Sequence, residues 1–183
     1  MTRTLKIVAV SGSASRKSRT AALSRALAEG IGREIAAETS FIHLADIAAE
    51  VGSTLWRDRA PAPVISALVE VEAADLLIVA SPVYRAAIPG LFKHFFDLVD
   101  QNGLIDTPVL LAASGGSPYH ALVLEHQLRP LFGFFQSLTL PIGVYGTDAD
   151  FTDYVVTGET LKVRIALAVA RAVPLLRALH PQD

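Results

Sequence analysis

Three short apolar runs along the chain predict strands that are buried on both faces. They cover residues 5–10, 75–80 and 108–113, and their apolar positions are nearly continuous instead of alternating with polar ones. Strands of a parallel sheet that is covered by helices on both sides have this pattern. Two further strands are expected at residues 39–44 and 139–145.

Helical spacing of apolar residues between these runs predicts the helices that cover such a sheet. One set recurs every four residues and comprises Leu23, Leu27, Ile31 and Ile35. Another has mixed spacing of three and four and comprises Val64, Leu68 and Val71. Residues 159–179 supply a long closing helix, and the tally is five strands alternating with five helices. This alternation favours right-handed crossovers and a doubly wound α/β sheet with the strand order 2-1-3-4-5.

The length of the chain indicates one domain. With 183 residues, of which 51% are hydrophobic, it can bury one sizeable core but is too short for two typical domains. A single domain spanning residues 1–183 is therefore expected. Its least regular region, residues 46–63, contains Trp56 and is expected to wrap the surface before the second helix.

Charge and composition exclude several function classes. The formal net charge is -2, with 16 Lys and Arg against 18 Asp and Glu, so no basic surface for nucleic acid is expected. The chain has no cysteine, which removes disulfides, thiolate metal sites and thiol catalysis. No apolar signal region opens the sequence and no apolar run approaches the ~18 residues of a membrane span. The expectation is a cytoplasmic protein that binds no nucleic acid, no membrane and no metal.

The loop at residues 11–20 follows the first expected strand and opens the first expected helix. Its sequence, Ser-Gly-Ser-Ala-Ser-Arg-Lys-Ser-Arg-Thr, supplies hydroxyl and guanidinium donors, and the start of a helix favours an anion. Gly12 is expected to let the backbone turn sharply. The loop matches neither GxGxxG nor GxxxxGK followed by Ser or Thr, which disfavours dinucleotide folds and nucleoside triphosphatases. A phosphate site is predicted, with simple helix capping by the serines as the alternative.

Two more loops are expected at the same edge of the sheet. Residues 81–85, Ser-Pro-Val-Tyr-Arg, follow the third strand, and residues 114–117, Ser-Gly-Gly-Ser, follow the fourth. Ligands of open α/β sheets bind beyond the carboxyl ends of the strands. Around Tyr84 the backbone presents hydrogen-bonding groups to a planar ring, and Gly115 and Gly116 permit close approach. The three loops together predict a site for an aromatic phosphate.

Four motifs combine into a resemblance that covers almost the whole chain. Gly-Ser and Ser-Arg-Thr stand at the two ends of residues 12–20, Ser-Pro-Val-Tyr at 81–84, Gly-Leu-Phe-Lys at 90–93, and Ser-Gly-Gly-Ser at 114–117. Together they resemble the NAD(P)H-dependent FMN reductases of flavodoxin-like fold. The resemblance is strongest to the reductases that serve alkanesulfonate, methanesulfonate and related sulfur-scavenging monooxygenases.

The resemblance implies a set of site residues and two cofactors, FMN and NAD(P)H. It implies phosphate contacts from Ser11, Ser13, Arg16, Ser18, Arg19 and Thr20. It implies ring contacts from Pro82, Val83, Tyr84, Ser114, Gly115 and Gly116. It also implies that the reduced flavin, FMNH2, leaves for a partner monooxygenase, so that FMN is as much substrate as cofactor.

No catalytic side chain is nominated, because a flavin itself accepts the hydride and the protein orients the rings. The five histidines, His43, His94, His120, His126 and His180, show no spacing that demands a catalytic role. Two alternatives stay open. One is a quinone, azo-dye or chromate reductase with tightly bound FMN, and the other is a flavodoxin-type electron carrier, against which the small net charge argues mildly.

The segment from 128 to 140 bears on assembly. Its apolar cluster of Phe132, Phe134, Phe135 and Leu138 spreads around more of a helix than one sheet face covers, which predicts a homo-oligomer. Completion of the core within one chain is the alternative. The family resemblance implies a tetramer, and in some members an inserted tyrosine creates a π-helical turn at the tetramer interface. Here His126 occupies that position, and the sequence leaves open whether the turn is kept.

Overall fold

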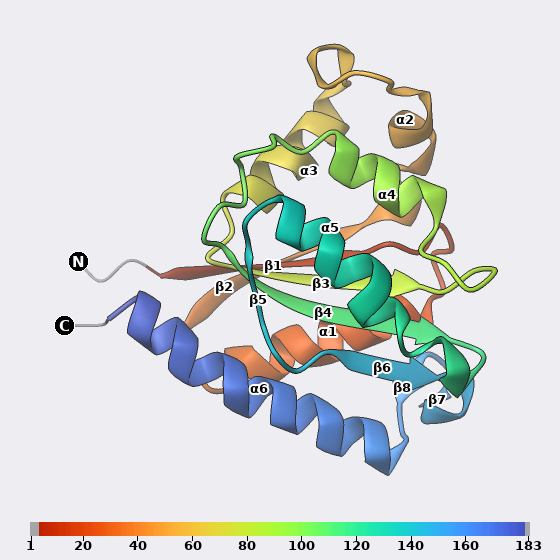
Figure 1. Cartoon of the computed structure of the whole chain (residues 1–183), viewed down its shortest axis with the longest axis vertical. Helices are drawn as coiled ribbons and strands as arrows, with labels where there is room; N and C mark the ends of the chain where they lie inside the picture. The colour runs from red at the N-terminus through yellow and green to blue at the C-terminus, as the bar shows by residue number, and fades with distance from the viewer. Residues whose placement is uncertain (1–3, 182–183) are drawn as a thin grey trace.

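A computed structural model describes residues 4–181 and places them in a parallel sheet flanked by helices (Figure 1). The sheet order is β2-β1-β3-β4-β5, which confirms the predicted doubly wound α/β arrangement. A sixth strand, β6, also pairs with β4, and all of these pairings are parallel. The strands are β1 (Leu5–Ser11), β2 (Ala37–His43), β3 (Leu76–Pro82), β4 (Pro108–Gly115), β5 (Leu138–Thr139) and β6 (Val144–Thr147).

The expected fifth strand at 139–145 is divided into β5 and β6. Pro141 lies between them, and a proline has no N–H group with which to continue a strand ladder. Two arginines bind carbonyl oxygens within the interruption. Arg129 Nη1 donates to the Leu140 oxygen at 3.1 Å, and Arg164 Nε donates to the Gly143 oxygen at 2.9 Å. The prediction of one continuous strand was therefore wrong at its centre.

The strands β3 and β4 run two residues further than the apolar pattern indicates. Ser81 pairs with Ala113, and Pro82 pairs with Ser114, although three of these four residues are polar or lack a donor. Because the sheet continues, the loops at 81–85 and 114–117 begin later than expected. The residues predicted to surround a ligand thus start from rigid strand ends.

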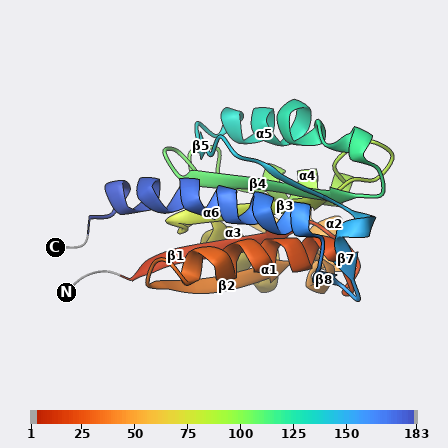
Figure 2. The same ribbon diagram turned by 90° about the horizontal axis from the view of Figure 1, so that it is seen from below.

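Helices cover both faces of the sheet (Figures 1 and 2). On one face lie α1 (Arg19–Gly32) and the closing helix α6 (Glu159–Leu179), whose bounds match the predicted 159–179. On the other lie α2 (Ala48–Ser53), α3 (Ala62–Glu72), α4 (Gly90–Asp97) and α5 (Arg129–Phe134). The apolar pattern did not predict α2, which lies in the irregular region at 46–63.

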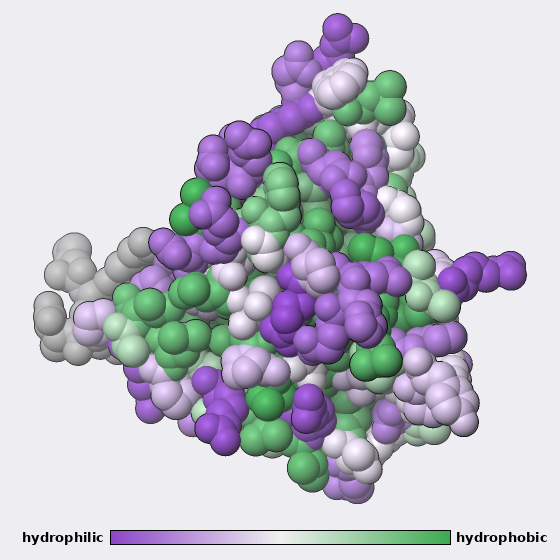
Figure 3. Space-filling model, in the orientation of Figure 1, coloured by the Kyte–Doolittle hydropathy of each residue, from purple (hydrophilic) through white to green (hydrophobic). Residues whose placement is uncertain are grey.

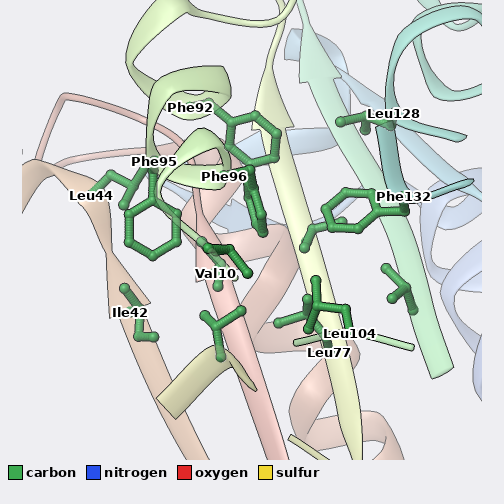
Figure 4. Close-up of a cluster of buried hydrophobic side chains, with 14 of the residues drawn as sticks. Val10, Ile42, Leu44, Leu77, Phe92, Phe95, Phe96, Leu104, Leu128 and Phe132 are labelled. Atoms are coloured by element: carbon green, nitrogen blue, oxygen red, sulfur yellow. The ribbon is translucent and has the colours of Figure 1, made fainter. Parts of the chain in front are cut away.

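Two apolar cores result from the period of two along each strand. In β1, Val8 and Val10 face the core shared with α2 to α5, whereas Ile7 and Ala9 face the core shared with α1 and α6. The first core holds a group of aromatic rings, and Phe92, Phe95, Phe96 and Phe132 are drawn together in Figure 4. The ring centroids of Phe96 and Phe132 lie 4.9 Å apart, so α4 and α5 interlock over the sheet.

The predicted helical faces are buried as expected. Leu23, Leu27 and Ile31 are fully buried in α1, as are Val64, Leu68 and Val71 in α3. Ile35 is buried too, although it lies beyond the end of α1. The remaining short elements are the turns of 3-10 helix at Leu44–Asp46, Arg57–Arg59, Pro118–His120 and Asp148–Asp150, and a hairpin of β7 (Phe151–Thr152) and β8 (Val155–Val156).

A turn of π-helix, η4 (Leu124–Leu128), precedes α5 and contains His126. The π-helical turn is therefore kept, although a histidine occupies the position of the tyrosine. The aromatic cluster that follows is divided between two environments. Phe132 and Phe135 are buried, as expected if the cluster completes the core of one chain. Phe134 is 66% exposed and Leu138 is 39% exposed.

Among residues 4–181, no helix has both the length and the apolar character needed to cross a membrane. The face of the molecule in Figure 3 shows hydrophilic and hydrophobic side chains interspersed. Exposed apolar residues are thus distributed over this face among polar ones.

Candidate functional site

The three predicted loops converge at the carboxyl ends of β1, β3 and β4. Gly12 N–H donates to the Ala80 oxygen at 2.8 Å, which ties the first loop to β3. Val83 N–H donates to the Ser114 oxygen at 2.8 Å, which ties the second loop to the third. The convergence expected from the strand order is present.

Ser11 lies where β1 ends and has an unusual hydroxyl. The side chain is buried, with 2% of the residue exposed, and its Oγ finds no hydrogen-bond partner among the described residues. A buried hydroxyl without a partner costs about 1–3 kcal/mol. Such a group keeps an unused donor and acceptor at the end of β1, in the segment that leads into α1, whose first backbone N–H groups favour an anion.

Gly12 is a glycine for a different reason from the one expected. No described glycine has a positive φ, so a sharp left-handed turn is not what the position requires. A Cβ at Gly12 would instead lie 2.2 Å from Cδ2 of Phe92. The ring of Phe92 in α4 packs against the backbone here, and only glycine leaves room for it.

Two serines of the first loop bind the backbone of their own segment. Ser13 Oγ accepts a hydrogen bond from Ser15 N–H at 3.1 Å. Ser18 is the N-cap of α1, and its Oγ accepts from Ala21 N–H at 3.3 Å. Ser18 therefore caps the helix, and its hydroxyl proton is still available to an anion.

The two arginines of the first loop pair with aspartates outside it. Arg16 Nε lies 3.6 Å from Asp46 Oδ1, and the Arg16 side chain is 83% exposed. Arg19 Nη1 lies 3.3 Å from Asp148 Oδ1, with both side chains about half exposed. Exposed pairs of this kind contribute little to stability, so both guanidinium groups are free to exchange partners.

The last residue of the predicted phosphate set faces the Gly-Gly loop. Thr20 and Ser114 are both buried, and their hydroxyl oxygens form a hydrogen bond with each other. The family resemblance implied a phosphate contact for Thr20 and a ring contact for Ser114. The structure brings them into one pair that joins α1 to β4.

The loop after β3 turns sharply at Arg85 and Ala86. Their φ angles are 54° and 64°, in the left-handed region, and neither is glycine. Tyr84 and Ala87 exchange two backbone hydrogen bonds across this turn, at 2.9 and 3.1 Å. Two left-handed central residues are typical of a type I′ turn. The turn presents Tyr84 with half of its surface exposed, beside the buried Pro82 and Val83.

The Gly-Gly loop is held by Tyr145 of β6. Tyr145 Oη donates to the Ser117 oxygen at 2.6 Å, and burial, together with the charge of Asp148, raises the pKa of the phenol. A Cβ at Gly115 would lie 2.7 Å from that Oη and 3.1 Å from Cβ of Val83. A Cβ at Gly116 would meet only Asp148 Oδ2, at an ordinary 3.7 Å. Gly115 is thus required by packing, whereas Gly116 would tolerate a Cβ.

Sequence reasoning missed two contributors to this edge. The first is the end of β6, where Tyr145 and Asp148 contact the Gly-Gly loop and Arg19; the expected fifth strand pointed there, but no ligand role was drawn from it. The second is His43 at the end of β2, whose Nε2 lies 3.0 Å from the Ser15 oxygen. Both could have been found from the rule that all carboxyl ends of a parallel sheet meet at one edge.

Another histidine, His94 of α4, has its Nε2 2.6 Å from the Thr54 oxygen. Among residues 4–181, no three His, Asp or Glu side chains are grouped so as to hold a metal ion. The groups gathered at the site are hydroxyls, guanidinium groups, backbone groups and an aromatic ring.

The residues present fit a flavin phosphate. The start of the 14-residue helix α1 and the unpartnered Ser11 hydroxyl suit a phosphate. The exposed surface of Tyr84 and the lack of a side chain at Gly116 suit a flat ring close to the backbone. The two halves lie on adjacent strand ends, as a molecule carrying both groups requires.

Comparison with known proteins decides the family. A sequence model described as NADPH-dependent FMN reductase matches residues 5–152 of the chain. The chain belongs to this FMN reductase family. Membership confirms the resemblance found in the motifs, and with it the class of oxidoreductases that use NAD(P)H and FMN.

Relatives within the FMN reductase family are similar over nearly the whole chain. The FMN reductase (NADPH) of Pseudomonas aeruginosa is 58% identical over 175 residues, covering 96% of this chain and 94% of the relative. The NADH-dependent FMN reductase SfnF of Pseudomonas fluorescens has the same identity and coverage. SfnE of Pseudomonas putida, also described as NADH-dependent, is 52% identical over 180 residues, with 98% and 97% covered.

Solved structures confirm the flavodoxin-like fold of this family member. The apo form of an NADH:FMN oxidoreductase superposes with a TM-score of 0.81 at 28% identity, covering 98% of this chain and 92% of that one. An oxidoreductase from Corynebacterium diphtheriae superposes with a TM-score of 0.77 at 30% identity, covering 96% and 97%.

Proposed function

We propose that the chain is one FMN-binding domain that reduces FMN with NAD(P)H and releases FMNH2 to a separate flavin-dependent monooxygenase. Organosulfur utilisation is the proposed setting. The family membership and the names of the relatives support the reaction, and the motif resemblance supports the setting. The observation on which the site rests is the buried, unpartnered hydroxyl of Ser11 at the end of β1, where the loop leading to α1 begins.

The proposed flavin contacts are those implied by the motifs. The phosphate is bound by the start of α1 with Ser11, Ser13, Arg16, Ser18, Arg19 and Thr20. The ring is bound by Pro82, Val83, Tyr84, Ser114, Gly115 and Gly116. Bound FMN supplies hydride acceptance, and the chain binds it, orients it and excludes water around its ring.

Replacing Ser11 tests the phosphate half of the site. Ser11→Ala is expected to raise the Kd for FMN about tenfold, the equivalent of one charge-assisted hydrogen bond, and to leave the Kd for riboflavin unchanged. The unfolding free energy of the FMN-free variant should not fall, because the hydroxyl has no protein partner to lose. Ser24→Ala is the matched control, since Ser24 is also buried in α1 but donates to the Ala21 oxygen. An equal loss for FMN and riboflavin contradicts the phosphate assignment.

Steady-state turnover tests the reaction itself. Oxidation of NADH and of NADPH is measured against FMN, FAD and riboflavin, with FMN expected to be preferred over riboflavin. The nucleotide preference is decided by the same assay, since relatives of equal identity differ in it. Turnover that is indifferent to added free FMN, in a preparation that carries bound flavin, contradicts release of FMNH2.

We also propose a homotetramer in the cytoplasm, where NAD(P)H is available. The exposed Phe134 of α5 and Leu122, which is 60% exposed just before η4, support an interface between subunits. Sedimentation of the wild type at micromolar concentration should give the tetramer, and Phe134→Asp should lower the assembly state. A monomeric wild type contradicts the proposal, and cell fractionation tests the location.

A further inference from the structure

The loop that presents Tyr84 packs on the first core through Ile88 and receives side-chain hydrogen bonds from Gln127, which lies outside it. Gln127 of η4 accepts a hydrogen bond from Ile88 N–H at its Oε1, at 2.8 Å. Its Nε2 donates to the Ala86 oxygen at 3.3 Å. One amide thus satisfies a donor and an acceptor of the same loop, on the two sides of Ala87.

The loop needs such a support because its backbone is strained. Arg85 and Ala86 have φ angles of 54° and 64°, and a left-handed conformation costs an L-residue about 1–2 kcal/mol. The two hydrogen bonds between Tyr84 and Ala87 close the turn but do not tie it to the rest of the molecule. Of the contacts described for residues 84–88, those of Gln127 are side-chain hydrogen bonds from a distant helix.

The side chain of Gln127 is held in place by its neighbours in η4. Gln127 is half-buried, and its neighbours Leu124 and Leu128 are buried on the inner side of η4. The widened turn also carries Glu125, which pairs with Arg129 on the outer side. The buried leucines fix this segment, whereas the partly exposed pair on the outer side contributes little to its position. The position of Gln127 is therefore determined by packing that does not involve the loop.

We infer that Gln127 is a positioning residue for the flavin ring, acting through the strained turn that presents Tyr84. This inference rests on the proposed function, because it takes the ring to lie beside Tyr84. In the presence of Gln127 the turn is held in its binding geometry before flavin arrives. Without it, the turn relaxes and flavin must restore the left-handed conformation at the expense of affinity.

The first test is Gln127→Leu, which keeps the size of the side chain and removes both hydrogen bonds. The KM for FMN is expected to rise about tenfold, while kcat at saturating FMN stays within about twofold. The KM for riboflavin should rise by the same factor, because the ring and not the phosphate is affected. Glu125→Gln is the matched control: it breaks a pair on the same helical turn and should leave both KM values unchanged.

A second change separates positioning from packing. An Asn-Gly pair adopts the left-handed turn readily, so Arg85→Asn with Ala86→Gly should restore most of the lost flavin affinity in the Gln127→Leu background. Gln127→Glu covers the case in which Gln127→Leu does not fold, since its carboxylate still accepts from Ile88 N–H. Its KM for FMN should lie between those of the wild type and of a variant without either bond.

The KM values for flavin decide whether Gln127 positions the ring. Unchanged flavin KM values in Gln127→Leu or in Gln127→Glu overturn it, and so does a loss that the Asn-Gly turn does not restore. Failure of the proposed function gives a different result, since the wild type then does not oxidise NAD(P)H with FMN at all.

Discussion

The hydroxyl oxygens of Thr20 and Ser114 lie 2.7 Å apart, in a buried contact between residues 94 positions apart in the chain. Thr20 opens α1 behind the first loop, and Ser114 stands at the end of β4 before the Gly-Gly loop. The pair therefore links the proposed phosphate half of the site to the proposed ring half. Either hydroxyl can donate, and the one that accepts keeps its own proton to offer a ligand.

Breaking this pair should weaken both the fold and flavin binding. Thr20→Val has the same shape and removes the hydroxyl, leaving Ser114 buried without its partner, which is expected to cost about 1–3 kcal/mol of unfolding free energy. Denaturant unfolding measures this cost. Thr20→Ser keeps the hydroxyl and should lose much less.

A double-mutant cycle of Thr20→Val and Ser114→Ala tests whether the two hydroxyls interact. If the contact is as described, Ser114→Ala should cost less in the Thr20→Val background than in the wild type, because the partner is already absent. Additive losses would show that the two hydroxyls do not interact.

Gly115→Ala is expected to destabilise the protein by about 1–3 kcal/mol, the usual cost of overpacking. The added Cβ would meet Oη of Tyr145 at 2.7 Å, and removing that oxygen should relieve the main clash. Gly115→Ala should therefore cost less in a Tyr145→Phe background than in the wild type. Part of the cost should persist, because Cβ of Val83 still lies at 3.1 Å.

Gly116→Ala is the control for this comparison, because a Cβ there meets only Asp148 at 3.7 Å. Its unfolding free energy should stay within about 0.5 kcal/mol of the wild type. Equal losses at the two glycines, measured by denaturant unfolding, would contradict the packing described for Gly115.

The pair of Glu125 and Arg129 gives a pH-dependent contribution to stability. The hydrogen bond from Arg129, with Nη2 2.9 Å from Glu125 Oε1, lowers the pKa of the carboxyl below its ordinary value. The folded state thus favours the ionised form, so the contribution is complete above the unfolded pKa, about 4.3, and disappears as the pH falls through the lower folded pKa.

The size of this effect is small because the Glu125 side chain is 48% exposed, and such pairs contribute well below about 1 kcal/mol. The measurement is the difference in unfolding free energy between the wild type and Glu125→Gln. That difference should be constant from pH 7 to about pH 5 and should shrink below about pH 4. A difference that grows on acidification would contradict the assignment.

The sheet could be predicted because its signals are local. Continuous apolar runs marked the buried strands, and the four-residue spacing of Leu23, Leu27 and Ile31 marked the helix that follows the first loop. The position of the loop then placed it at the binding edge. Pro141 was a visible warning that the fifth strand is interrupted, since proline cannot continue a ladder.

The contacts within the site could not be predicted, because they join distant segments. Nothing around Gly12 in the sequence shows that Phe92 packs on its backbone, so glycine was assigned a turn that the structure does not contain. Likewise, helical periodicity does not show that the amide of Gln127 reaches a loop 39 residues earlier. These relationships arise only when the layers pack.

The divided fifth strand also determines how copies of this protein can meet. An exposed sheet edge offers unpaired N–H and C=O groups to which a strand of another molecule can add, which is the beginning of fibrous aggregation. At this edge Pro141 offers no N–H, and the carbonyl groups of Leu140 and Gly143 are already bound by Arg129 and Arg164. The edge is thereby closed to strand addition at the interruption, which lowers the tendency of the folded protein to aggregate through this strand.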